Sequence, residues 1–157
     1  MKRFALNGTA LLVSILLAAG AAAFGGMYGP GEWYRGLAKP EWNPPNWVFG
    51  PVWSFLYLSM AVAAWLVWLR RDRHRTVLPL GLYGTQLVLN ALWSWLFFGL
   101  HRMGLAFAEI VLLDGLIIAC AVAFWPVHRF AALLMIPYAA WVSFAAFLNL
   151  TLWRMNG

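Results

Sequence analysis

The chain has 157 residues, of which 64% are apolar and only 10% are charged. A soluble domain of this size would carry about a quarter charged residues, so the composition excludes an ordinary water-soluble fold and indicates an integral membrane protein. The net charge of +6 does not point to nucleic acid as a partner, because the eleven Lys and Arg residues lie at the ends of apolar segments and form no patch beside a groove-reading element.

Five apolar segments follow one another along the chain, at about residues 5–24, 47–69, 77–100, 104–125 and 130–152. An α-helix of about twenty residues spans the roughly 30 Å hydrocarbon core of a bilayer. The sequence therefore predicts an all-α membrane protein, a bundle of five transmembrane helices with a long structured loop between helices 1 and 2. We expect residues 1–157 to form a single domain.

The first segment admits a second interpretation, a signal peptide that is cleaved after export. It begins with Lys2 and Arg3, and small residues alternate near its end. Two features favour a retained helix. The apolar run has full spanning length, and Ser14, Ala18 and Ala22 form a stripe of small residues that suits close helix packing.

The basic residues predict the orientation of the five spans, which place the two termini on opposite sides. One side would hold Lys2, Arg3, Arg70, Arg71, Arg73, Arg75 and Arg129, and the other Arg35, Lys39, Arg102 and Arg154. Since positive loops favour the cytoplasm, we expect a multi-pass protein of a bacterial membrane with a cytoplasmic N-terminus. The first loop, about residues 25–46, and the C-terminus would then lie outside.

The first loop leads into the motif W-Y-x-x-L-x-K-P-x-W-x-P-P, which starts at Trp33. Four of the eleven Trp and five of the eight Pro lie between residues 30 and 53. Pro40, Pro44 and Pro45 prevent a regular helix and stiffen an extended backbone. Tryptophan offers a large flat face, which suits a lid over a flat ligand. On composition alone, an aromatic belt at the membrane interface explains the tryptophans better.

Three of the predicted spans each carry a polar or aromatic stripe at helical spacing. The stripes are Trp53 and Tyr57 in the second span, Gln86, Asn90, Trp93 and Phe97 in the third, and Tyr138, Trp141, Ala145 and Leu148 in the fifth. An amide within hydrocarbon needs a partner, so the stripe of the third span should face protein or a cavity. Hydrogen bonds between helices and simple packing also explain these stripes.

Taken together, these motifs resemble the TspO/MBR family of tryptophan-rich sensory proteins and the translocator protein, also called the peripheral-type benzodiazepine receptor. The resemblance covers nearly the whole chain. It rests on the five spans, the first-loop motif, N-x-x-W at Asn90–Trp93, and I-P-Y-x-x-W-x-x-F-A at Ile136–Ala145. L-N at Leu148–Asn149 and W-R at Trp153–Arg154 complete it.

The resemblance implies a ligand pocket inside the bundle, beneath the first loop. It assigns to the pocket Tyr34, Trp53, Tyr57, Asn90, Trp93, Trp141, Phe144 and Ala145, and to a lid Trp33, Trp42, Pro44 and Pro45. The implied ligands are tetrapyrroles such as protoporphyrin IX and haem, with no cofactor required. Membrane lipids and a second copy in a homodimer are the other expected partners.

One motif of the family is incomplete in this chain. The C-terminal cholesterol-recognition pattern, L/V-x-Y-x-K/R, has Leu150 where the central Tyr would stand. Such patterns are weak even when complete. The departure disfavours a sterol as the physiological ligand.

Ionisable residues offer no conventional catalytic or metal site. Glu109 and Asp114 are five residues apart, about 140° around a helix, so they cannot act as a carboxylate pair. We expect Asp114 to be protonated or hydrogen-bonded, since an isolated carboxylate in a membrane is costly. His74, His101 and His128 fall in short loops, where we expect solvated side chains and no axial ligand for haem.

The sequence thus predicts a membrane receptor or sensor that binds tetrapyrroles and acts in porphyrin regulation or transport. A flat macrocycle would stack on Trp53 and Trp141. Two alternatives remain open at this point. One is an enzyme-like oxidative or light-driven degradation of porphyrin, with Trp53 and Trp141 as the candidate catalytic residues. The other is a transporter of lipid or sterol, although the broken midplane helices and repeats typical of transporters are not evident.

Overall fold

The computed structural model describes the backbone of residues 2–157 and the side chains of residues 6–157. Within that range the chain is all-α, without a β-strand. The helices are α1 (Lys2–Gly26), α2 (Glu32–Gly36), α3 (Asn46–Trp68), α4 (Val77–Ser94), the π-helix η1 (Trp95–Gly99), α5 (Met103–Phe124) and α6 (Arg129–Asn156). Every apolar segment predicted as a span is therefore helical.

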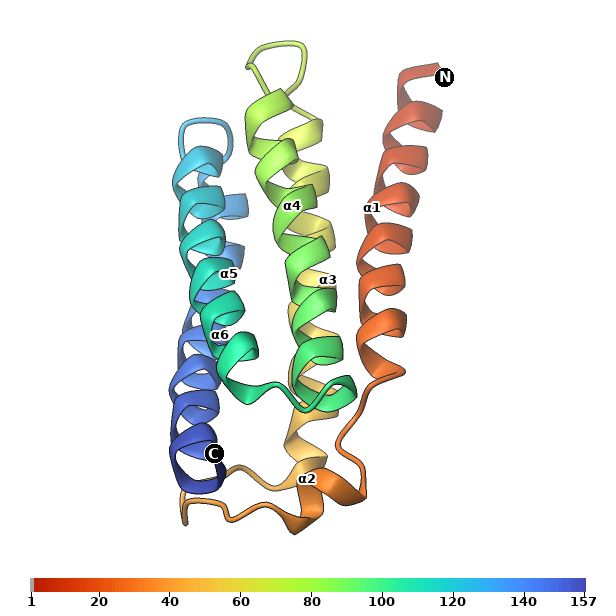
Figure 1. Cartoon of the computed structure of the whole chain (residues 1–157). Helices are drawn as coiled ribbons and strands as arrows, with labels where there is room; N and C mark the ends of the chain where they lie inside the picture. The colour runs from red at the N-terminus through yellow and green to blue at the C-terminus, as the bar shows by residue number, and fades with distance from the viewer. Residues whose placement is uncertain (1) are drawn as a thin grey trace.

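The long helices lie side by side, and the short helix α2 lies across one end of the bundle (Figure 1). Helix α5 packs against both α4 and α6, while α1 packs against α3 and α4. The first loop and the C-terminus share one end of the bundle, and the N-terminus lies at the other (Figure 1). This arrangement brings the tryptophan- and proline-rich segment over the ends of α3, α4 and α6.

Four of the described helices are long and apolar enough to cross a membrane: α1 from Leu6, α3, α5 and α6. These helices define a multi-pass membrane protein. Helix α4, with 18 residues, is not among the four. The count of five crossings therefore stays a prediction.

Proline and histidine residues mark the starts of the helices that carry the cavity. Pro45 directly precedes α3. The proline ring restricts φ, and the backbone of Pro45 is extended. His128 caps α6, since its Nδ1 accepts a hydrogen bond of 3.3 Å from the amide of Ala131. The sequence did not predict this capping role for His128. His128 is half-buried because its ring replaces a missing backbone partner at the first turn of the helix.

The interior of the bundle contains both apolar side chains and the predicted polar stripe. Leu56, Met60 and Ile117 are buried among α3, α5 and α6, and Gln86 and Asn90 are buried with them. The prediction that the stripe of α4 faces protein is thus confirmed. A second buried cluster forms at the end of the bundle near the first loop, where Tyr34 joins residues of η1 and α6.

The π-helix η1 was not predicted. Its widened turn is closed by a hydrogen bond of 2.8 Å from the amide of Leu100 to the carbonyl of Trp95. Such turns occur frequently at functional sites, because they alter the direction of side chains that a regular helix would present. Here η1 directs Phe97 and Phe98 to the cavity described below.

Candidate ligand-binding cavity

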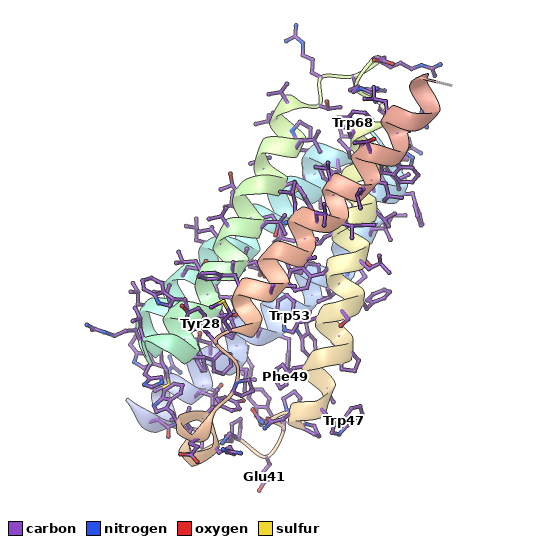
Figure 2. The ribbon with its side chains drawn as sticks, turned by 90° about the vertical axis from the view of Figure 1, so that its right-hand side faces the viewer. Tyr28, Glu41, Trp47, Phe49, Trp53 and Trp68 are labelled. Atoms are coloured by element: carbon purple, nitrogen blue, oxygen red, sulfur yellow. The ribbon has the colours of Figure 1, made fainter. Side chains whose placement is uncertain are left out.

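A cavity of about 220 Å³ lies inside the bundle at the end covered by the first loop. Its walls come from the end of α1, the first loop, α3, α4, η1 and α6. Figure 2 shows Phe49 and Trp53 on the side of α3 that faces the other helices, whereas Trp47 points away from them. The walls are mostly aromatic and aliphatic, which is typical of small-molecule sites.

The structure brings seven of the eight predicted pocket residues together around this cavity. They are Tyr34, Trp53, Tyr57, Asn90, Trp93, Trp141 and Ala145. Phe144 does not line it. It is half-buried on α6, where its ring lies 5.5 Å from that of Trp141 and 6.0 Å from that of Trp42. The seven positions share one space, and a role in ligand binding stays a prediction for each.

Several lining residues were not predicted. Tyr28 and Pro30 contribute from the segment that leaves α1, and Asn149 contributes from α6. Asn149 and a further lining residue, Phe49, follow a signal that the sequence contains, since Phe49 lies one helical turn before Trp53 and Asn149 lies one turn after Ala145. Nothing in the helical periodicity indicates Tyr28 or Pro30, because they belong to no helix.

A chain of hydrogen bonds joins three helices at the inner end of the cavity. The hydroxyl of Tyr57 donates to Oδ1 of Asn90, and Nδ2 of Asn90 donates to the hydroxyl of Tyr138 at 3.0 Å. The Tyr138 hydroxyl in turn donates to Oε1 of Gln86 at 2.8 Å. Gln86 therefore serves helix association, whereas Asn90 serves helix association and also lines the cavity. Leaving one such buried group unpaired would cost roughly 1–3 kcal/mol.

The indole groups of Trp93 and Trp141, which both line the cavity, differ in their hydrogen bonding. Nε1 of Trp93 donates to Oδ1 of Asn149 at 3.1 Å, so Trp93 offers the cavity only its ring. Nε1 of Trp141 is buried and has no partner among the described residues. Trp141 therefore lines the cavity while its own indole N–H is buried without an acceptor among the described residues.

Tyr34 attaches the first loop to the bundle. It is only 3% exposed, and its ring lies 5.5 Å from that of Phe98. Its hydroxyl donates to Oδ1 of Asn43 at 3.0 Å. Burial raises the pKa of the Tyr34 hydroxyl, and the hydrogen bond with Asn43 lowers it by a smaller amount. The hydroxyl therefore stays protonated at neutral pH, and its hydrogen bond with Asn43 joins two residues of the first loop.

Asn156, near the end of α6, holds the same loop from the other side. Its Oδ1 accepts from the amide of Ala38 at 2.9 Å, and its Nδ2 donates to the carbonyl of Ala38 at 3.0 Å. One side chain thus satisfies both backbone groups of a loop residue that is remote in sequence. No local pattern indicates this contact.

We expect Asn156→Ala to loosen the first loop without disturbing α6. Two hydrogen bonds worth about 1 kcal/mol each would be lost, so amide exchange around Ala38 should accelerate by about tenfold or more. Hydrogen–deuterium exchange read by mass spectrometry would measure this. Thr151→Ala is the matched control, because the Thr151 hydroxyl bonds only within its own helix, to Phe147. Equal exchange in both variants would contradict the anchoring role.

The four residues predicted as a lid lie outside the cavity walls. Trp33 stacks on His101, with ring centres 4.1 Å apart, and Trp42 stacks on Phe147 at 5.3 Å. Pro44 and Pro45 form the entry to α3. None of the four lines the cavity. The first-loop residues that do line it include Pro30 and Tyr34. Adjacent residues on a helix point about 100° apart, so α2 turns Tyr34 inward and Trp33 outward.

The remaining ionisable residues lie away from the cavity. One carboxylate oxygen of Asp114 accepts a hydrogen bond of 2.7 Å from Ser143, which confirms that Asp114 is hydrogen-bonded. Glu109 is 8% exposed, and neither of its oxygens has a partner among the described residues. His74 and His101 are exposed, as expected, although His101 also contacts Trp33. The described residues include no cluster that could hold a metal ion.

Comparison with known proteins agrees with this architecture. The TspO/MBR family matches residues 11–154. The translocator proteins of Sus scrofa and Homo sapiens are each 46% identical over 127 residues, which cover 80% of this chain and 75% of theirs. Protein CrtK of Rhodobacter capsulatus is 40% identical over 149 residues, 94% of this chain and 93% of its own. The protein described here is thus a multi-pass membrane protein, and it belongs to the TspO/MBR family.

Proposed function

We propose that this protein is a membrane receptor that binds a tetrapyrrole, such as protoporphyrin IX or haem, in the cavity beneath the first loop. The observation that carries the proposal is the cavity with mostly aromatic walls, which Trp141 lines and where the buried indole N–H of Trp141 has no acceptor among the described residues. Aromatic rings favour a flat apolar ligand, and the buried N–H without an acceptor favours one that carries a hydrogen-bond acceptor. The macrocycle and the carboxylates of a porphyrin supply both features.

The size of the cavity supports a movable lid. At about 220 Å³ it is smaller than the roughly 300–1,000 Å³ of typical small-molecule sites. A porphyrin therefore enters only when the walls separate. The first loop is the part that can move, since a small number of side-chain contacts attach it to the helices, among them Tyr34 on Phe98, Trp42 on Phe147 and Asn156 with Ala38. The structure accordingly corresponds to the closed form of the proposed receptor.

We also propose that α4 and η1 together make a fifth crossing of the membrane within one five-helix domain. Their 18 and five residues extend over about 30 Å. Gln86 and Asn90 make α4 less apolar, but both are buried inside the bundle and need not contact lipid. With five crossings, the excess of basic residues at the end of the bundle that holds the N-terminus favours a cytoplasmic N-terminus, with the first loop and the C-terminus outside a bacterial membrane. Homodimerisation is part of the same proposal.

Labelling of introduced cysteines tests this orientation. Glu41→Cys in the first loop should react with a membrane-impermeant maleimide added outside intact cells, and Arg73→Cys should react only after permeabilisation. Both positions are exposed, and Glu41 points away from the bundle (Figure 2). The native Cys120 is buried and supplies little background. Labelling of Arg73→Cys in intact cells would reverse the proposed topology.

Purified protein mixed with protoporphyrin IX, first in darkness and then in light, tests the function. Saturable quenching of tryptophan fluorescence with one porphyrin per chain, and no new product, is the result expected of a receptor. A new absorbing species that forms only with the protein present would favour degradation at Trp53 and Trp141. Uptake of porphyrin into proteoliposomes would favour transport. The absence of saturable quenching would overturn tetrapyrrole binding itself.

Histidine ligation should contribute nothing to the binding of haem. None of the three histidines lines the cavity, so we expect His74→Ala, His101→Asn and His128→Asn combined to leave the haem Soret band and affinity unchanged. Asparagine tolerates the positive φ of 56° at position 101 and can cap α6 at position 128. A lost Soret shift with intact protoporphyrin IX binding would show that a histidine reaches the iron.

A further inference from the structure

A polar pocket of about 340 Å³ lies between the end of α3 and the start of α6. The loops after α3 and after α5 share the end of the bundle that holds the N-terminus, so this pocket lies at the opposite end from the first loop (Figure 1). Its lining is Leu66, Leu69, Arg70, Asp72, Arg73 and His128. None of these residues lines the cavity beneath the first loop. The pocket is therefore a separate feature of the molecule.

Two arginines give this pocket an excess of positive charge. Arg70 and Arg73 are both exposed, and both line the pocket from the segment that follows α3. The amide of Arg73 donates to the carbonyl of Arg70 at 2.9 Å, and this turn keeps the two residues close together. Asp72 also lines the pocket and already has an interaction of its own. The lining thus contains two guanidinium groups and a single carboxylate.

These two arginines are placed differently from their neighbour in the same segment. The guanidinium of Arg71 lies 3.4 Å from the centre of the Trp68 ring and donates to the Trp68 carbonyl at 3.2 Å. Within the described part of the chain, no aromatic ring holds Arg70 or Arg73 away from the pocket in this way. The positive-inside rule accounts for the number of arginines at this end, but it does not account for two of them meeting a residue of another helix around one hollow.

His128 supplies a third polar group, from the start of α6. Its Nδ1 accepts the hydrogen bond of 3.3 Å from the amide of Ala131, so the neutral ring carries its proton on Nε2. The N–H at Nε2 is a donor that the helix cap does not use. Helix α6 has 28 residues, and the positive end of its dipole adds to the field of the two arginines. Apart from Asp72, the polar groups of the lining therefore favour an anion.

We propose that this pocket binds a phosphate monoester. Such a group carries nearly two negative charges at neutral pH, which match two guanidinium groups. Guanidinium donors also fit phosphate oxygens in pairs. Leu66 and Leu69 form the apolar part of the lining and leave room for the organic substituent of the ester. Two sources supply this chemistry at the end of a membrane bundle: the headgroup of phosphatidic acid and a soluble phosphate ester.

Isothermal titration calorimetry of the purified protein in an uncharged detergent tests the proposal and separates the two sources. The probes are dihexanoyl phosphatidic acid, glycerol 3-phosphate, which carries the same monoester without acyl chains, and dihexanoyl phosphatidylcholine, a zwitterionic diester. We expect saturable binding of a monoester at one per chain and no saturable binding of phosphatidylcholine. Tighter binding of phosphatidic acid than of glycerol 3-phosphate would identify the lipid headgroup, and any other order a soluble ester. Absence of saturable binding by both monoesters, or equal binding of phosphatidylcholine, would overturn the proposal.

A matched pair of variants tests the place of binding. Arg73→Gln removes a guanidinium from the lining, whereas Arg75→Gln removes one from the same exposed loop outside the lining. We expect Arg73→Gln to weaken binding of the monoester by about tenfold, because charge-assisted hydrogen bonds are lost. Arg75→Gln should weaken it by less than about twofold, since a charge outside the pocket is screened. Both variants should keep the helicity of the parent by circular dichroism. Equal weakening by the two variants would show diffuse attraction to a basic surface and overturn the pocket as the site.

Discussion

Replacing Trp141 with alanine is expected to weaken the binding of protoporphyrin IX by about thirtyfold while leaving the bundle folded. Trp141 lines the cavity, and its buried indole N–H has no partner among the described residues. Loss of aromatic stacking removes about 1 kcal/mol, and loss of one hydrogen bond removes about 1 kcal/mol more. Together these correspond to a factor of about thirty in Kd. Fluorescence quenching by the porphyrin measures it directly.

Two further variants separate the two contributions of Trp141. Trp141→Phe keeps a ring beside Phe49, whose centre lies 5.9 Å from that of Trp141, but removes the N–H. This variant should bind protoporphyrin IX only about fivefold more weakly than the parent, because it loses the hydrogen bond but keeps the stacking. Trp47→Ala is the control for tryptophan content, because Trp47 is 75% exposed and points away from the other helices (Figure 2). Tight binding by a folded Trp141→Ala variant would remove Trp141 from the site.

Replacing Pro40, Pro44 and Pro45 together with alanine is expected to speed the dissociation of the porphyrin by about tenfold or more. Each proline restricts the open loop, and each replacement adds conformational freedom worth about 0.4–1 kcal/mol that must be lost again on closing. The closed cavity is small, so ligand exchange depends on opening of the loop. A less favourable closed state shortens the residence of the ligand.

Stopped-flow measurement of the association and dissociation rates decides between a lid and an interfacial belt. Pro126→Ala is the matched control, since Pro126 is an exposed proline in the turn between α5 and α6. A dissociation rate equal to that of the parent in the triple variant would show that the first loop does not retain the ligand. The tryptophans of the loop would then be better explained as an aromatic belt at the membrane interface.

Helical periodicity predicted the inward faces of the long helices, because one side of a helix in a bundle must meet protein. Gln86 and Asn90 illustrate this, since their spacing placed both inside before any contact was known. The periodicity of α6 also located Trp141 and Ala145, although it could not show that Phe144 lies beside Trp42 and does not line the cavity.

Structural features that do not follow the helical repeat could not be predicted from the sequence pattern. Helix α2 has only five residues between two non-helical segments, so periodicity could not show that Tyr34 would enter the core, and only the family resemblance assigned Tyr34 to the pocket and Trp33 to a lid. The π-turn of η1 changes the direction of Phe97 and Phe98 without a residue that marks it. The contact of Asn156 with Ala38 joins positions 118 apart in the chain, which no local rule can indicate.

The hydrogen-bonded chain from Tyr57 to Gln86 gives the cavity a definite polarity. The amides of Asn90 and Gln86 point their oxygens at hydroxyl donors, so the direction of donation runs from the cavity into the bundle. The hydroxyl of Tyr57 therefore directs its proton inward and keeps a lone pair that can accept a hydrogen bond, while the buried N–H of Trp141 still lacks an acceptor. A guest with an acceptor on one edge and an N–H or O–H on another matches both groups in a single orientation.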